Sequence, residues 1–326
     1  MCTAVCYKTK SFYFGRTLDN DVSYGEEVVV TPRRFPFSFR HAGQAGEHYA
    51  MIGTAFVPDG FPLYYDAVNE KGLCAAGLNF VGSAFYGKGE GDKVGLAQFE
   101  FIPYLLGSCA SVREAAAALQ NITVLDEPYN AGMPPAKLHW LIADRKEAVT
   151  LECTGEGMRL YENPVGVLTN EPPFPVQMFR LNDFMGLSPR EPKNTFSRKL
   201  PLRAYSRGMG ALGLPGDLSS SSRFVRAAFA ARNAVSGSGE AESVAQFFHI
   251  LGFVSQPRGC AAAGEGYEVT IYSACCNADA GVYYYSTYED PAVRAVDMRR
   301  EDLGGKVLAR YPFRRRLTVL RENSVR

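Results

Sequence analysis

The order in which strand-like and helix-like segments follow one another is the feature that most restricts the fold of this chain. Apolar runs bounded by turn residues predict strands at residues 2–7, 11–16, 27–31, 50–57, 63–68, 73–80, 138–143, 148–153, 158–162, 267–273, 281–288, 293–298 and 316–320. Helical periodicity predicts helices at residues 99–106, 111–121, 177–185, 223–235 and 240–252. Blocks of strands thus alternate with blocks of helices, which predicts an antiparallel α+β domain with sheets stacked between helical layers.

The connections between these segments carry turn residues. Residues 33–44 are expected to form a surface loop, residues 82–95 a mobile Gly-rich loop, residues 169–175 a Pro-rich break and residues 275–280 the link between two late strands. Ser111 is a predicted N-cap, and Glu114 completes a capping box with it. Continuous βαβ alternation is absent, and no Gly-x-Gly-x-x-Gly follows a strand, so nothing indicates a dinucleotide site.

Composition describes an ordinary globular protein. The 326 residues are 46% hydrophobic and 21% charged, and no composition shift or internal repeat divides them, so we expect residues 1–326 to form one domain. The formal net charge of +1 provides no electrostatic footprint for nucleic acid or for an anionic membrane. No apolar run is long enough to span a membrane and no signal peptide is recognisable, so the expected location is the cytoplasm.

The eight cysteines are expected to be reduced thiols, because a chain of this length without a secretory signal has no need of a disulfide framework. No Cys-x-x-Cys is present, and the four histidines are scattered along the sequence. Cys275 and Cys276 would point to opposite faces of a strand. The sequence therefore predicts neither a metal site nor a cofactor.

The second residue, Cys2, carries a possible chemistry of its own. Removal of Met1 would leave Cys2 with a thiol and a free α-amine, which is a nucleophile with a built-in base. Arg16 could stabilise the thiolate, and Asp19 could orient the amine. The competing interpretation is that Cys2 is a small apolar residue at the start of an edge strand, as most free cysteines are.

Several segments, taken together, resemble the choloylglycine hydrolase family, which contains bile salt hydrolases and penicillin V acylases. They are residues 1–3, 14–19, 62–66, 69–73, 77–80, 138–140, 168–172, 222–226 and 267–273, which follow one another in the family's order over essentially the whole chain. The resemblance implies an N-terminal-nucleophile hydrolase with a four-layer αββα sandwich and with Cys2 on the first strand of an inner sheet.

The resemblance also implies a role for each of six residues. Cys2 is the nucleophile and its freed α-amine the proton acceptor, while Arg16 lies beside the thiol and Asp19 binds the amine. Asn79 and Asn170 are expected to build the oxyanion hole, and Arg223 to close the polar cluster around the N-terminus. Like Cys2, each of the other five residues also has a structural interpretation, because arginines form ion pairs and Asn and Asp serve turns.

Two other patterns have simpler explanations. His139 and Trp140 suggest a Cys–His pair, but the α-amine already supplies a base, and His139 in a strand is expected to be packed. Three consecutive tyrosines, residues 283–285, could stack on nucleic acid bases, but without a basic charge balance they favour packing in a sheet.

The resemblance implies a substrate with an amide bond between a bulky acid and a small amine. Asn79 stands where penicillin V acylases often have Tyr, which favours a bile salt hydrolase acting on glycine- or taurine-conjugated bile acids. The pocket is expected to include Leu18, Tyr24, Phe61, Met133 and Leu138. The alternatives are a penicillin V acylase, an N-acyl-homoserine-lactone acylase, and a non-catalytic sterol-binding protein on the same fold.

Two further expectations concern the whole molecule. Only Met1 precedes Cys2, so maturation is expected to need a methionine aminopeptidase alone. The resemblance also implies a homotetramer, in which residues 184–216 are expected to be the contact arm. The preference between glycine and taurine conjugates stays open at this point.

Overall fold

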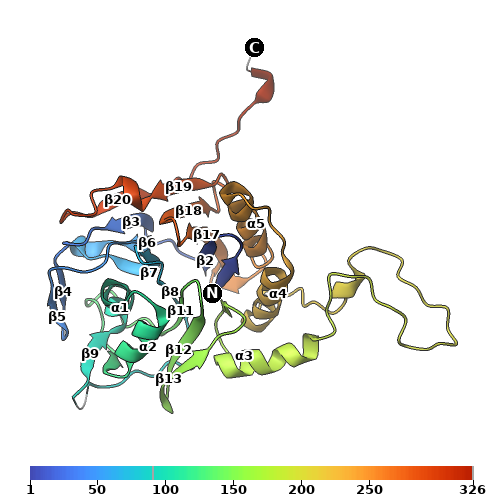
Figure 1. Cartoon of the computed structure of the whole chain (residues 1–326), viewed down its shortest axis with the longest axis horizontal. Coiled ribbons are helices and arrows are strands. Elements are labelled where there is room, and N and C mark those ends of the chain that lie inside the picture. The colour runs from blue at the N-terminus through green and yellow to red at the C-terminus, as the bar shows by residue number, and fades with distance from the viewer. Residues whose placement is uncertain (90–91, 325–326) are drawn as a thin grey trace.

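The computed structural model describes residues 1–89 and 92–324, and its centre is a pair of stacked antiparallel sheets (Figure 1). The first sheet has six strands in the order β14-β1-β2-β17-β18-β19. Their bounds are Val167–Leu168, Cys2–Lys8, Phe12–Asn20, Val269–Asn277, Val282–Thr287 and Arg294–Asp297. The N-terminal strand β1 is therefore an inner strand that pairs with both β14 and β2.

The second sheet has eight strands in the order β13-β12-β11-β8-β7-β6-β3-β20. Their bounds are Gly157–Glu162, Ala148–Thr154, Leu138–Ala143, Cys74–Asn79, Leu63–Asn69, Met51–Phe56, Glu27–Thr31 and Ala309–Pro312. Three two-stranded ribbons lie outside the sandwich: β4 with β5 (Phe37–Phe39, Gly43–Ala45), β9 with β10 (Val94–Ala97, Ile122–Leu125) and β15 with β16 (Ala262–Ala263, Gly266–Tyr267).

Helices cover the outer face of each sheet. Helices α4 (Ser220–Asn233) and α5 (Glu240–Gly252) pack on β1, β2 and β17 of the six-stranded sheet. Helix α1 (Phe101–Ser108) packs on β7 and β8 of the other sheet, with α2 (Val112–Leu119) beside it (Figure 1). The four-layer αββα sandwich expected from the sequence is thus confirmed.

The sandwich explains why so many strands read as continuous apolar runs. In β3, Val28 and Val30 face the gap between the two sheets, whereas Val29 faces the helices α1 and α2. Both faces of the strand are buried, so the usual alternation of apolar and polar residues is lost. Helix α2 begins at the predicted N-cap, because the Ser111 side chain accepts a hydrogen bond from the backbone N–H of Glu114 at 3.2 Å. The predicted capping box does not form, because the Glu114 carboxylate accepts from the backbone N–H of Ala110 instead of Ser111.

Several sequence predictions need correction. Residues 33–44 are not simply a surface loop, because Phe37 and Phe39 of the β4–β5 ribbon are buried against apolar neighbours. Residues 275–277 belong to strand β17 instead of a connection, since they pair with β18. The predicted strand at 316–320 does not form: the last strand is β20, which pairs with β3.

Other segments differ only in their bounds. Helix α3 (Phe174–Arg180) begins earlier than predicted and passes into a 3-10 turn, Leu181–Phe184. The Gly-rich segment 82–95 includes residues 90–91, which lie outside the described residues, and it ends in strand β9. Residues 186–216 are irregular, as predicted, apart from a 3-10 turn at Met209–Ala211. They project from the body of the molecule beyond α3 (Figure 1). In the described part of the chain, no helix combines the length and apolarity that crossing a bilayer requires.

Candidate active site

Cys2 begins strand β1 in the interior of the six-stranded sheet. It pairs with Leu18 of β2, and only 2% of its surface is exposed. Its backbone N–H donates to Oδ1 of Asn170 at 2.9 Å, which lies just beyond β14. Strand pairing and this hydrogen bond together fix the backbone of Cys2. The residue is therefore an ordered part of the sheet, although it lies next to the chain terminus.

Arg223, in the first turns of helix α4, contacts the residues around Cys2. We call the buried group formed by Cys2, Asp19, Asn170 and Arg223 the N-terminal corner. Its Nη1 donates to the carbonyl oxygen of Cys2 at 2.5 Å and to Oγ1 of Thr3 at 2.6 Å. Its Nη2 donates to Oδ1 of Asn170 at 2.6 Å. Burial lowers the pKa of Arg223, although the charge of nearby Asp19 opposes this effect. The guanidinium is fully buried, so it acts as a fixed cation at the N-terminal corner.

Asn170 faces the Cys2 nitrogen with its oxygen. Because Oδ1 accepts from both Cys2 and Arg223, the orientation of the amide group is defined by its neighbours. Its Nδ2 donates to the carbonyl oxygen of Asn79 at 2.8 Å, which uses one of its two hydrogens. The side chain of Asn79 lies on the exposed end of β8, at the other sheet. The two asparagines predicted to form an oxyanion hole are therefore brought together.

Asp19 is buried in the same corner and is held by several donors. Its Oδ1 accepts from Oγ1 of Thr270 at 2.7 Å, and its Oδ2 accepts from Nε2 of Gln256 at 3.3 Å. The distance from its Oδ2 to Nη1 of Arg223 is 3.9 Å. Burial raises the pKa of Asp19, while Arg223 and Thr270 act in the opposite direction. Sequence reasoning missed Gln256, for which no motif gives a signal, and Thr270, which lies in one of the resembling segments.

Met1 occupies the space in front of Cys2. Its amino group donates to the carbonyl oxygen of Asp19 at 2.5 Å and to Oε1 of Glu268 at 3.0 Å. Its carbonyl oxygen accepts from the backbone N–H of Asp19 at 2.8 Å. Loss of Met1 would release the backbone groups of Asp19 and the Glu268 carboxylate from these three contacts.

Arg16 projects from β2 into the gap between the sheets. Its Nη1 donates to the carbonyl oxygens of Tyr65 at 3.0 Å and Gly77 at 2.6 Å, both on the eight-stranded sheet. Burial alone would lower the pKa of this guanidinium, but the negative potential of neighbours, Cys2 foremost, raises it above its usual value. Arg16 thus lies near the thiol, as predicted, and bridges the two sheets.

The five predicted substrate residues have different surroundings. Leu18 and Leu138 lie beside the catalytic candidates, because they pair with Cys2 and Asn79 respectively. Met133 is half-buried, and Tyr24 is 58% exposed on the loop after β2. Phe61 packs against aromatic rings of the apolar core between the eight-stranded sheet and helix α1. Its centroid distances are 5.7 Å to Phe37 and 6.2 Å to Phe99.

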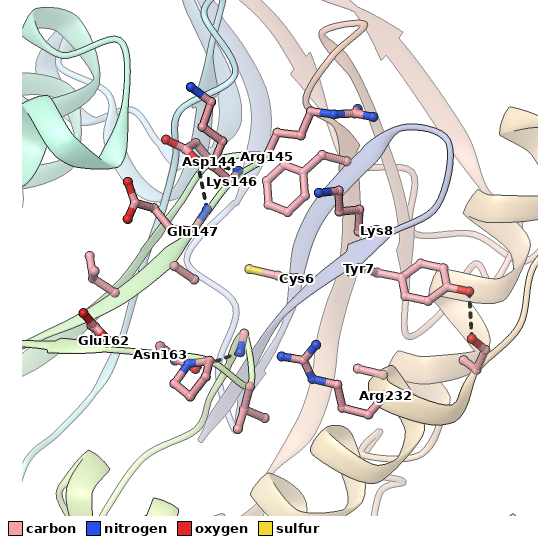
Figure 2. Close-up of a pocket in the computed structure, with 18 residues that line it drawn as sticks. Cys6, Tyr7, Lys8, Asp144, Arg145, Lys146, Glu147, Glu162, Asn163 and Arg232 are labelled. Atoms are coloured by element: carbon pink, nitrogen blue, oxygen red, sulfur yellow. Dashed lines mark hydrogen bonds between the residues drawn. The ribbon is translucent and has the colours of Figure 1, made fainter.

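A cavity of about 660 Å³ lies at the opposite end of β1 from Cys2 (Figure 2). It contains none of the predicted site residues. Figure 2 shows Cys6 pointing into it, with charged side chains of both signs around it, among them Lys8, Lys146, Glu162 and Arg232. Most of these charges are at the surface. Volume does not single out a site, because another cavity, lined by residues 293–296 and 310–314, measures about 720 Å³. Buried and mutually bonded polar groups instead select the Cys2 corner.

His139 is packed, as predicted. Its ring is fully buried and stacks on Phe80 with a centroid distance of 4.2 Å. Its two nitrogens lie 3.0 Å from Oε1 of Glu152 and 2.9 Å from the carbonyl oxygen of Thr169. All eight cysteines are free. Within residues 1–89 and 92–324, no group of three or more His, Cys, Asp or Glu side chains could hold a metal ion.

Comparison with known proteins identifies the class of this chain. Residues 2–311 match the family model described as linear amide C–N hydrolases, choloylglycine hydrolase family. The chain is 50% identical over 315 residues to the bile salt hydrolase/transferase of Lactiplantibacillus plantarum, an alignment covering 96% of this chain and 97% of that protein. It is therefore a linear amide C–N hydrolase. Within that class the chain belongs to the choloylglycine hydrolase family.

Solved structures agree with this assignment. A mutant of the conjugated bile acid hydrolase from Clostridium perfringens superposes with a TM-score of 0.91 at 32% identity, covering 99% of this chain and 100% of that one. The penicillin V acylase from Agrobacterium tumefaciens gives a TM-score of 0.75 at 22% identity, over 95% of this chain and 90% of that one. The second likeness concerns the fold alone, which the two proteins share.

Proposed function

We propose that this chain hydrolyses the amide bond of glycine- or taurine-conjugated bile acids, with the Cys2 thiol as nucleophile. The observation that carries the proposal is the corner in which Asn170 and Arg223 hold both backbone groups of a buried Cys2. The choice of substrate is supported by the 50% identical relative, which is named a bile salt hydrolase/transferase.

In the proposed first step, loss of Met1 frees the α-amine of Cys2. The amine takes the thiol proton while the sulfur attacks the amide carbonyl carbon and forms a tetrahedral intermediate. The proposed donors to the oxyanion are the exposed side-chain amide of Asn79 and the second Nδ2 hydrogen of Asn170. Donors of this kind typically contribute about 3 kcal/mol each to the transition state.

In the second step the carbon–nitrogen bond breaks. The α-ammonium returns its proton to the leaving nitrogen, which departs as glycine or taurine and leaves a thioester on Cys2. Water then attacks the thioester with the α-amine as base, which releases the free bile acid and restores the thiol. No redox partner or metal is required by this balance of atoms.

The surrounding residues have supporting roles in this proposal. Asn170 and Asp19 orient the α-amine, the first through its Oδ1 and the second from the buried face of the corner. Arg223 keeps Asn170 in its orientation, and Arg16 favours the thiolate through its charge. The sterol is proposed to contact Leu18, Leu138, Met133, Tyr24 and Phe61. Of these, Leu18 and Leu138 have the strongest support, because they lie beside Cys2 and Asn79.

The test is a comparison of rates on glycocholate, taurocholate and penicillin V. Protein whose intact mass shows the loss of Met1 should release glycine or taurine, which amino-acid analysis detects, faster than it cleaves the side-chain amide of penicillin V. Folded protein that lacks Met1 but releases neither amino acid would refute the proposal. Faster cleavage of penicillin V would instead favour an acylase of that class, and full activity with Met1 retained would exclude the α-amine as base.

We also propose that residues 184–216 are a contact arm in a homotetramer. Large apolar side chains on and next to this arm are exposed, among them Phe179 at 75%, Met185 at 87%, Phe196 at 83% and Tyr205 at 86%. Exposure of this kind in a projecting segment is typical of a surface that another chain covers. Light scattering should give the mass of four chains, and a lower mass after Phe196→Ser with Tyr205→Ser. A wild-type mass of one chain would contradict this. The cytoplasmic location stays a prediction, which cell fractionation tests.

A further inference from the structure

A buried acidic cluster that the proposed chemistry does not use lies between the two sheets. Asp66, on β7 of the eight-stranded sheet, is 1% exposed. Its Oδ2 accepts a hydrogen bond from the hydroxyl of Tyr272 at 2.7 Å, and its Oδ1 accepts one from the hydroxyl of Tyr283 at 2.6 Å. Because β17 and β18 carry these tyrosines, the cluster joins one sheet to the other.

The guanidinium of Arg16 lies beside this cluster. The two carbonyl groups that accept from its Nη1 belong to Tyr65, which precedes Asp66, and to Gly77, which follows the strand partner of Asp66. Its Nη2 is buried and has no hydrogen-bond partner among the described residues. This atom therefore depends on neighbouring charges instead of direct bonds for its stabilisation. Cys2 and Asp66 both contribute to the negative potential around Arg16.

We propose that Asp66 is a positioning residue for the reaction at Cys2. Its carboxylate balances the charge of Arg16 and, with Tyr272 and Tyr283, keeps that guanidinium against the backbone of β7 and β8. Asp66 thereby sets the pH range in which the Cys2 thiol reacts. The inference rests on the proposed function, because it takes Cys2 to be the nucleophile.

The physical reason is competition for one buried cation. A thiolate on Cys2 and a carboxylate on Asp66 both gain from the charge of Arg16, and each disfavours the other. Burial raises the pKa of Asp66, with Arg16 and the two tyrosines opposing. The other groups that face the thiol or Arg16 are Arg223, Tyr65 and Asp19, and none of them bonds to the Asp66 carboxylate.

The main test is the Asp66→Asn variant, in which shape is kept but the negative charge is lost. The rate of Cys2 alkylation by iodoacetamide, followed by mass spectrometry, should reach half its maximum about one pH unit lower than in the wild-type protein. The acidic limb of kcat/KM on glycocholate should move in the same direction. Without the Asp66 carboxylate, Arg16 should be held less firmly, and kcat at the optimum pH should fall about tenfold. An unchanged alkylation midpoint in folded protein would overturn the proposal.

Three further variants separate positioning from mere stability. Asp66→Glu keeps the charge and should restore the wild-type midpoint. Glu100→Gln removes another buried carboxyl group, one that accepts from the backbone N–H of Arg40 at 2.8 Å on the far side of the sheet. That variant should lose stability without moving the midpoint. Tyr272→Phe weakens the ionised state of Asp66 and should shift the midpoint downward by a fraction of a pH unit.

The remaining variants still test the proposal if Asp66→Asn does not fold. Tyr272→Phe then carries the test, and an unchanged midpoint in that variant would count against the proposal. Alkylation does not depend on the substrate, so failure to cleave bile salts would refute the proposed function while leaving the Asp66 result interpretable. A midpoint shift in the Asp66 and Tyr272 variants, but not in Glu100→Gln, supports Asp66 as the residue that sets the pH range.

Discussion

Two cysteines on the same strand, Cys2 and Cys6, occupy opposite ends of β1 and have contrasting surroundings. Cys2 is enclosed by Arg16, Arg223 and Asn170, which are buried and tied to backbone groups. Cys6 lines the cavity of Figure 2, and burial raises its pKa to about 12, although the charge of Arg232 acts against this. One thiol has fixed cations beside it, whereas the other is half-buried at the cavity and has mainly the cost of partial burial.

The comparison separates the size of a cavity from the chemistry of a site. At the Cys6 end, Lys8 and Arg232 are exposed, so water screens their charges and their side chains are free to reorient. At the Cys2 end, the cations are held in place where little water reaches them, so their effect on a neighbouring thiol is larger. Preorganised charge, and not volume, is what distinguishes the candidate active site.

The largest effect is expected from Cys2→Ser. A hydroxyl ionises far less readily than a thiol, so kcat/KM on glycocholate should fall on the order of a thousandfold or more, with the fold retained. Circular dichroism checks the fold, and glycine release measures the rate. The matched change at the other end of the strand, Cys6→Ser, should leave the rate within a few-fold of wild type. Equal losses in the two variants would contradict the assignment.

Alkylation should distinguish the two thiols directly. At pH 8 a thiol with a pKa of about 12 is ionised in only about one molecule in ten thousand, so Cys6 should be almost inert to iodoacetamide. Cys2 should react at least about a hundredfold faster, and glycocholate should protect it. Cys260 is exposed and should also react, but without protection by substrate, which makes it the internal control. Labelling of Cys6 at the rate of Cys2 would show that the contrast is wrong.

The fixed cation can be tested through stability. Arg223→Met removes the cation that lies 3.9 Å from the buried Asp19 carboxylate and one of the two donors to the Asn170 oxygen. Removal of one member of a buried pair typically lowers the free energy of unfolding by about 3–5 kcal/mol, which urea denaturation measures. The exposed pair of Arg159 with Glu156 provides the control, and Arg159→Met should cost less than about 1 kcal/mol. A similar loss in both variants would mean that the corner is not specially organised.

Much of the fold could be predicted because local pattern and tertiary environment agree. Strands β3, β11 and helix α5 have the predicted bounds, since apolar runs and helical periodicity are both unambiguous there. The strand predicted at residues 316–320 was wrong because local pattern and tertiary environment disagree there. Its Leu-Thr-Val-Leu run has strand propensity, but the chain has already supplied the edge strand β20, and Leu320 remains 86% exposed.

The candidate site was only partly predictable. Cys2, Arg16, Asp19, Asn170 and Arg223 meet in one corner, but this could be expected only through the family resemblance, because their separations in sequence contain no local signal. The orientation of Asn170 and the contact of Gln256 with Asp19 depend on where β14, α4 and β17 converge. Asp66 gave no functional signal either, since a single acidic residue in a strand becomes informative only when two tyrosines from another sheet reach it.

The smallest effect is a pH dependence of stability that arises at Cys6. An unfolded thiol ionises near pH 8.5, whereas Cys6 in the folded protein keeps its proton until about pH 12. Between these values the unfolded chain binds fewer protons than the folded one, so the stability that Cys6 contributes is complete below pH 8.5 and is lost as the pH rises. The slope from one proton is about 1.4 kcal/mol per pH unit.

Urea denaturation of the wild-type protein and of Cys6→Ala at pH 7, 8, 9 and 10 measures this slope. The difference in unfolding free energy between the two proteins should be constant up to pH 8 and then shrink as the pH increases, because only the wild type loses the Cys6 contribution. Cys260→Ala removes an exposed thiol and should run parallel to the wild type throughout. A constant difference for Cys6→Ala across the whole range would show that Cys6 is as hydrated as a surface thiol, and the contrast with Cys2 would then need another explanation.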